Sequence, residues 1–151
     1  MIRILLSEDE PPKREKIVAF LNIQRPSAEV TVTASVRETT DYLEDHTPDL
    51  LLLDMSLPTF SVTTGERGGR PQGSGGIEIM RYMELLEVSC PVIVVTAYPA
   101  ITLEGREHSL PQLDKKLREE HGDIYRGLVY FNSVYGAWSS ELADAMAEIG
   151  V

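Results

Sequence analysis

The chain has 151 residues, which suits one domain with one hydrophobic core. Its hydrophobic content of 42% and charged content of 25% are typical of a globular protein and argue against disorder across the chain. The net charge of −10 disfavours non-specific binding of nucleic acid, because phosphates are bound by Lys and Arg. No apolar run approaches the roughly 20 residues of a membrane-spanning helix, and the N-terminus turns acidic too early for a secretory signal. The single cysteine, Cys90, excludes an internal disulfide, so we expect a cytoplasmic protein.

Short apolar segments alternate five times with segments of helical periodicity. The predicted strands are Ile2–Leu6, Val30–Thr33, Leu50–Leu53, Pro91–Thr96 and Gly127–Phe131. The predicted helices run from Pro11 to Pro26, over Val36–His46, over Ile77–Glu87, from a capping box at Ser109 to about Glu120, and along an apolar stripe from Trp138 to Ile149. This alternation predicts an α/β fold with a doubly wound, five-stranded parallel sheet and helices on both faces.

The four leucines Leu50–Leu53 are the least obvious strand, because leucine is a good helix former. Pro48 before them and Pro58 after them leave no room for a helix. A continuously apolar strand is what a parallel sheet covered on both faces requires. We therefore expect this strand to lie inside the sheet.

One low-complexity stretch, Thr59–Gly76, is rich in Gly, Ser, Thr and Arg and lies between the third strand and its helix. It offers little apolar surface to bury, so we expect a flexible insertion there. A domain boundary is not expected, because neither half could close a core alone. Residues 1–151 are therefore predicted to form one domain, with a second extended segment over 98–122.

Acidic and hydroxyl residues follow three of the predicted strands. Glu8 and Asp9 follow the first strand, Asp54 follows the third, and Thr96 ends the fourth. Ligands of open α/β sheets bind at the carboxyl ends of the strands, so three carboxylates are expected to face one another. Such a cluster repels itself unless a cation neutralises it, and oxygen ligands of this kind suit Mg²⁺. The site could hold a phosphoryl group on Asp54, with Mg²⁺ and the Thr96 hydroxyl stabilising its oxygens.

Each of these residues also has an ordinary structural explanation. An Asp after a strand is commonly a turn residue or a helix cap, and acidic residues before a helix favour its positive N-terminus. Either explanation would suffice for a single residue. The joint pattern of acids after strands one and three and a Thr at the end of strand four favours a functional site.

The sequence resembles the receiver domain of bacterial response regulators, the family of the chemotaxis response regulator, which has a flavodoxin-like topology. Four segments carry the resemblance, and they are Ile4–Glu10, Asp49–Pro58, Gly76–Arg81 and Pro91–Ala97. The resemblance implies that Asp54 is the phospho-acceptor and Thr96 the switch hydroxyl. It also implies that Asp9 binds Mg²⁺ directly, Glu8 through water and Ser56 through its backbone carbonyl.

The sequence departs from the family at the last strand. The family places a Lys at the end of that strand, whereas this chain has Phe131 and has no Lys after Lys116. The switch aromatic of the same strand falls on Leu128, with Tyr130 a weak substitute one register away. The acidic cluster is therefore expected to lack its usual cation, which makes this an atypical receiver.

Three functions follow as hypotheses. The first is a stand-alone receiver that takes a phosphoryl group from a sensor histidine kinase or a phosphotransfer protein and signals to a downstream protein partner. The second is a receiver that acts as an interaction module without phosphorylation, which the missing Lys favours. The third, ranked far below, is an Mg²⁺-dependent phosphohydrolase, which typically has a second acid where this chain has Ser56. We thus expect a signalling domain rather than an enzyme, with no nucleic-acid or membrane partner, and homodimer formation is left open.

Overall fold

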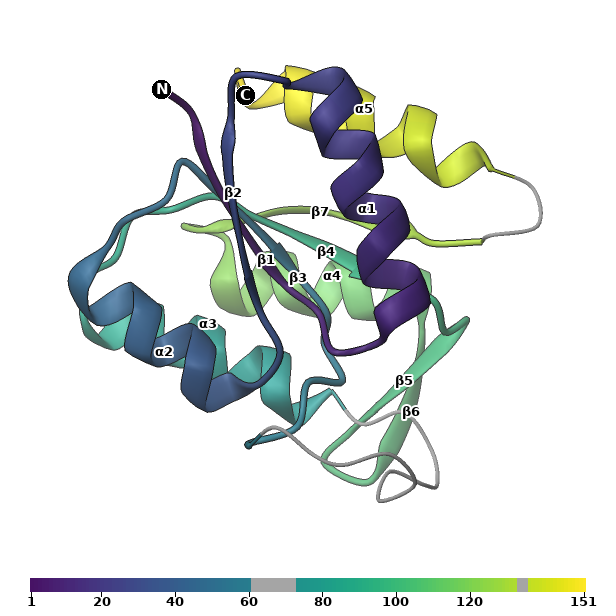
Figure 1. The fold of residues 1–151 in the computed structure, drawn as a ribbon. Coiled ribbons are helices and arrows are strands. Elements are labelled where there is room, and N and C mark those ends of the chain that lie inside the picture. Colours follow the sequence, from purple (N-terminus) through teal and green to yellow (C-terminus); the bar gives the residue numbers. More distant parts are fainter. Residues whose placement is uncertain (61–72, 133–135) are drawn as a thin grey trace.

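The computed structural model describes residues 1–60, 73–132 and 136–151. Five parallel strands form its central sheet, in the order β2-β1-β3-β4-β7. They are β1 (Arg3–Ser7), β2 (Glu29–Thr33), β3 (Leu50–Leu53), β4 (Val92–Thr96) and β7 (Tyr125–Tyr130). The predicted doubly wound sheet is confirmed, and its five strands coincide with the predicted ones to within two residues at each end (Figure 1).

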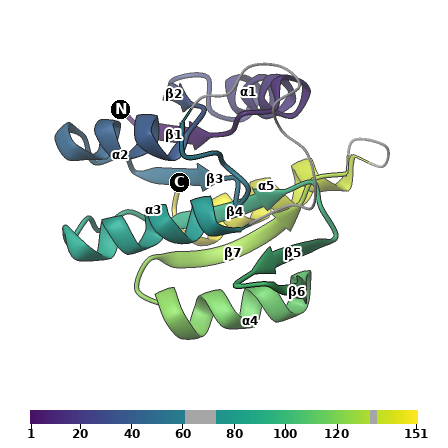
Figure 2. The same ribbon diagram turned by 90° about the horizontal axis from the view of Figure 1, so that it is seen from below.

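Helices cover both faces of the sheet (Figures 1 and 2). One layer contains α1 (Pro11–Gln24) and α5 (Ala137–Glu148), and the other contains α2 (Val36–Asp45), α3 (Ser74–Leu85) and α4 (Leu110–His121). Side chains of β3 alternate between the layers: Leu50 and Leu52 pack with α1 and α5, whereas Leu51 and Leu53 pack with the other three helices. All four leucines are fully buried, as expected of a strand covered on both faces.

A β-hairpin between β4 and α4 was not predicted from the sequence. It consists of β5 (Ala100–Leu103) and β6 (Arg106–Ser109), paired antiparallel around Glu104 and Gly105. Both turn residues have positive φ, 51° and 75°, which is typical of the tight turn that joins two short strands. Ile101 and Leu103 are buried in the same core as α3 and α4, so the hairpin belongs to the body of the fold. It accounts for the first half of the extended segment expected over 98–122, and α4 accounts for most of the rest.

The stretch expected to be a flexible insertion, 59–76, lies for the most part outside the described residues. Residues 59–60 and 73–76 of it are described, and the end of the stretch corrects the prediction, because Ser74–Gly76 form the first turn of α3. Gly75 and Gly76 are buried there against the loop that follows β3. Their lack of a side chain is thus a packing requirement, whereas from the sequence they indicated a linker. Along the described stretches, no helix has both the length and the apolar composition needed to cross a bilayer.

Candidate functional site: an acidic cluster at the carboxyl edge of the sheet

Three carboxylates meet where β1 and β3 end. Glu8 and Asp9 directly follow β1, and Asp54 directly follows β3, the strand paired beside it. Each offers one carboxylate oxygen, and these oxygens lie within 4.8 Å of one another. Glu8 and Asp54 are buried, at 1% and 3% exposure, and Asp9 is partly exposed. The structure therefore brings together the three acids that the strand ends predicted.

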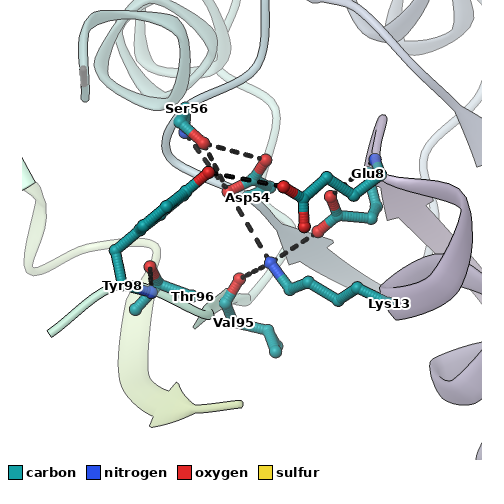
Figure 3. Close-up of polar contacts among 8 residues, drawn as sticks. Glu8, Lys13, Asp54, Ser56, Val95, Thr96 and Tyr98 are labelled. Atoms are coloured by element: carbon teal, nitrogen blue, oxygen red, sulfur yellow. Dashed lines mark hydrogen bonds and ion pairs between the residues drawn. The ribbon is translucent and has the colours of Figure 1, made fainter. Parts of the chain in front are cut away.

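Asp54 is held in place by its own loop. Its backbone N–H donates to the Ser7 carbonyl at 3.0 Å, which continues the pairing of β1 with β3. The Ser56 hydroxyl donates to both carboxylate oxygens of Asp54, at 3.1 and 3.2 Å, and the Ser56 backbone N–H lies 3.3 Å from Oδ1 (Figure 3). The carboxylate is thus oriented by two groups two residues further along the chain.

Thr96 lies at the same edge of the sheet, at the end of β4, and is fully buried. Its hydroxyl oxygen accepts a hydrogen bond from the backbone N–H of Tyr98 at 3.1 Å. The ring of Tyr98 extends toward Ser56 and Asp54 in Figure 3, and its hydroxyl donates to Glu10 at 3.3 Å. The segment after β4 therefore contacts the acidic loop after β1 across the site.

The structure also shows a residue of the site that the sequence reasoning missed, Lys13. It is the third residue of α1 and only 4% exposed. Its Nζ lies 2.6 Å from Glu8 Oε1 and 3.7 Å from Asp54 Oδ1, and donates to the Val95 carbonyl at 2.7 Å (Figure 3). The expectation that the cluster lacks an ammonium is therefore wrong, because α1 supplies one instead of the last strand. The sequence did contain a signal: Lys13 shares the buried face of α1 with Ile17, Phe20 and Leu21, at helical spacing.

Phe131, at the position where the family has its Lys, belongs to the hydrophobic core. It follows β7, is 6% exposed and packs against Trp138 with ring centroids 4.8 Å apart. Trp138 in turn contacts Phe20 of α1 at 5.5 Å. These three rings form one aromatic cluster between the sheet, α1 and α5, so Phe131 contributes packing rather than charge.

The environment of Glu8 favours its protonated form in the metal-free protein. Burial raises the pKa of Glu8 from 4.5 to about 8, the nearby Asp54 carboxylate adds to the rise, and Lys13 opposes it. Unfolding restores the ordinary pKa, so the unfolded chain releases this proton at lower pH than the folded one. The contribution of Glu8 to stability is therefore present below pH 4.5 and is lost as pH rises from about 4.5 to about 8.

We expect Glu8→Gln to remove this pH dependence, because the amide keeps an acceptor for Lys13 and does not titrate. Urea unfolding with a chelator present, at about pH 5 and about pH 8, measures the effect. On going from the lower to the higher pH, the native protein should lose more unfolding free energy than Glu8→Gln does. An equal change in both proteins would show that Glu8 is not held in its protonated form.

The donor set fits Mg²⁺. This ion prefers oxygen ligands at about 2.1 Å in octahedral geometry, so oxygens on opposite sides of it lie about 4 Å apart. The three carboxylate oxygens lie within 4.8 Å of one another, so a single ion could be held among them. Glu8, Asp9 and Asp54 are thus the residues of the described chain that would hold the ion.

Removing Asp9 should weaken Mg²⁺ binding about tenfold or more, because one of three anionic ligands is lost. Amide chemical shifts recorded during an Mg²⁺ titration of Asp9→Ala measure the affinity. Glu10→Ala is the matched control, since Glu10 is the next acid along the chain and is not part of the cluster. Equal affinities for Asp9→Ala and the native protein would refute the metal assignment.

Comparison with known proteins places the chain in a family. The family model of the response regulator receiver domain matches residues 4–106, which contain Glu8, Asp9, Lys13, Asp54 and Thr96. The chain belongs to the response regulator receiver domain family. The β7 strand and Phe131 lie beyond the matched residues.

A sequence relative supports this assignment, and two solved structures share the fold. The chain is 30% identical over 121 residues to the Detocs response regulatory protein DtcB of Vibrio alginolyticus, covering 79% of this chain and 81% of that protein. Its fold is similar to the receiver domain of a sensor histidine kinase from Pseudomonas aeruginosa, which was solved with magnesium coordinated in its active-site cleft. The alignment with that receiver domain has a TM-score of 0.61 at 21% identity, and it covers 99% of this chain and 98% of the other. The response regulator TrrA of Thermotoga maritima, solved with Mg²⁺ and beryllofluoride, gives a TM-score of 0.58 at 18% identity, covering 96% and 99%.

Proposed function

We propose that the chain, as one receiver domain over residues 1–151, accepts a phosphoryl group on Asp54 and transmits the signal to a protein partner. The donor would be a phosphohistidine of a sensor histidine kinase or of a phosphotransfer protein. The observation that carries the proposal is the arrangement around Asp54: a buried carboxylate, oriented by Ser56, with two further acids within 4.8 Å and an ammonium at 3.7 Å. Membership of the receiver family supports the same function.

In the proposed reaction, one Asp54 carboxylate oxygen attacks the phosphorus of the donor. A phosphorus–oxygen bond forms, the phosphorus–nitrogen bond of phosphohistidine breaks, and the imidazole nitrogen keeps the electron pair of the broken bond. Bound Mg²⁺ would supply positive charge against the phosphoryl oxygens. The Thr96 hydroxyl, at the neighbouring strand end, is the donor proposed for one of those oxygens.

The acidic cluster with its cation favours this function over an interaction module that works without phosphorylation. An interaction-only module was suggested by the absence of a Lys after β7. Because Lys13 supplies an ammonium to the cluster, that absence no longer argues against phosphorylation. Ser56 occupies the place where phosphohydrolases typically have a second acid, and its hydroxyl is engaged with Asp54.

Beryllofluoride, which mimics a phosphoryl group on a carboxylate, tests the proposal. With Mg²⁺ present it should bind the native protein and shift amide resonances at the ends of β1, β3 and β4, and it should not bind Asp54→Ala. Asp45→Ala is the control, because Asp45 is an exposed acid at the end of α2. Equal binding by native protein and Asp54→Ala would exclude Asp54 as the acceptor, and binding by neither would favour the interaction-only module.

A further inference from the structure

The ammonium of Lys13 is buried beside the proposed acceptor and reaches it from a different element than the family uses. Burying a charge is costly unless partners compensate it, and Lys13 has three. Nζ contacts Glu8 after β1, Asp54 after β3 and the Val95 carbonyl of β4. The side chain thus joins three neighbouring strand ends at the point where a phosphoryl group would be attached.

We propose that Lys13 is the cation that contacts the phosphoryl group on Asp54, in place of the lysine that other receivers carry after their last strand. The inference rests on the proposed function. Among the described residues, no other cation forms an ion pair with Asp54. Phe131, at the family's lysine position, packs in the aromatic cluster with Trp138 and offers no donor.

The distances indicate how Lys13 responds to phosphorylation. In the unphosphorylated site its short contacts are with Glu8 at 2.6 Å and Val95 at 2.7 Å, whereas Asp54 is at 3.7 Å, beyond a hydrogen bond. A phosphoryl group adds negative charge and acceptor oxygens on the Asp54 side. Nζ then exchanges part of its contact with Glu8 and Val95 for a phosphoryl oxygen. Because Lys13 lies in the first turn of α1, this exchange connects phosphorylation to α1 rather than to β7.

The test uses acetyl phosphate as the donor, with saturating Mg²⁺ and phosphorylation followed by intact mass. In this reaction an Asp54 oxygen bonds to phosphorus and acetate leaves with the electron pair. Lys13→Met, which keeps the apolar stem without the charge, should be phosphorylated about tenfold to a hundredfold more slowly. Its Mg²⁺ affinity, from amide shifts, should be at least that of the native protein, because a cation has left the acidic site. A role in folding alone would not lower the rate while preserving Mg²⁺ binding. Lys16→Met, at an exposed position one turn away, should behave as the native protein does.

Phosphorylation of Lys13→Met at the native rate would overturn the inference and leave the proposed function intact. A native protein that takes no phosphoryl group would overturn both. If Lys13→Met does not fold, a crystal structure of the native protein with Mg²⁺ and beryllofluoride decides the question. Nζ of Lys13 within hydrogen-bond distance of a fluorine supports the inference, and Nζ still on Glu8 and Val95 only refutes it.

Discussion

Gly75→Ala is expected to destabilise the protein and to slow phosphorylation of Asp54, although Ala is the better helix former. A Cβ at Gly75 would overlap the backbone carbonyl oxygen of Leu57 and lie 3.1 Å from its carbonyl carbon. Leu57 belongs to the loop that begins at Asp54, and the next helical residue, Gly76, donates its N–H to Met55 of that loop at 3.0 Å. Backbone atoms cannot rotate away as a flexible side chain can, so the methyl group must displace the loop or the helix.

The expected cost is about 1–3 kcal/mol, the range for overpacking a tight site, and it outweighs the gain of up to about 1 kcal/mol that Gly-to-Ala gives in a helix. Chemical unfolding measures the stability, and intact mass after acetyl phosphate treatment measures the acceptor. Ser74→Ala is the matched control, since Ser74 is exposed in the same turn. A Gly75→Ala variant more stable than the native protein would show that the helix and the loop are not in close contact.

Trp138→Ala is expected to cause a larger loss of stability, about 3–5 kcal/mol. Trp138 is 8% exposed and contacts both Phe131 after β7 and Phe20 of α1, so its removal leaves a cavity between α5, α1 and the sheet. Urea unfolding gives the free energy directly. Trp138→Phe keeps an aromatic ring there and should cost less than half as much. Similar small losses for both variants would mean that the aromatic cluster does not join α5 to the body.

Much of the fold could be predicted because hydrophobic burial dominates it. The apolar runs Leu50–Leu53 and Pro91–Thr96 require two covered faces, and that requirement defines a parallel sheet with helices on both sides. The hairpin around Glu104 and Gly105 was missed because its strands have only four residues each and its second strand is largely polar. The start of α3 was missed because Gly75 and Gly76 are poor helix formers. Glycine is required at both positions because a loop distant in the sequence packs closely against them.

The site could be predicted only in part, because the sequence places the residues at strand ends but not the reach of a long side chain on a helix. Acids directly after strands must lie at the edge where the strands end, so Glu8, Asp9 and Asp54 could be placed from their positions alone. Lys13 has a long side chain on a helix, and its position in the sequence does not say which strand end its ammonium reaches. Only the packing of α1 against β4 shows that Nζ meets the Val95 carbonyl and the acidic cluster together.

The central claim is that Asp54 becomes phosphorylated, and mapping the modified residue tests it most directly. Borohydride reduces an aspartyl phosphate to homoserine, so treatment after incubation with acetyl phosphate and Mg²⁺ leaves a stable mark at the acceptor. Peptide mass mapping should find homoserine at position 54 and at no other aspartate, Asp9 included. Homoserine at a different aspartate, or none anywhere in a protein that remains folded and binds Mg²⁺, would contradict the account.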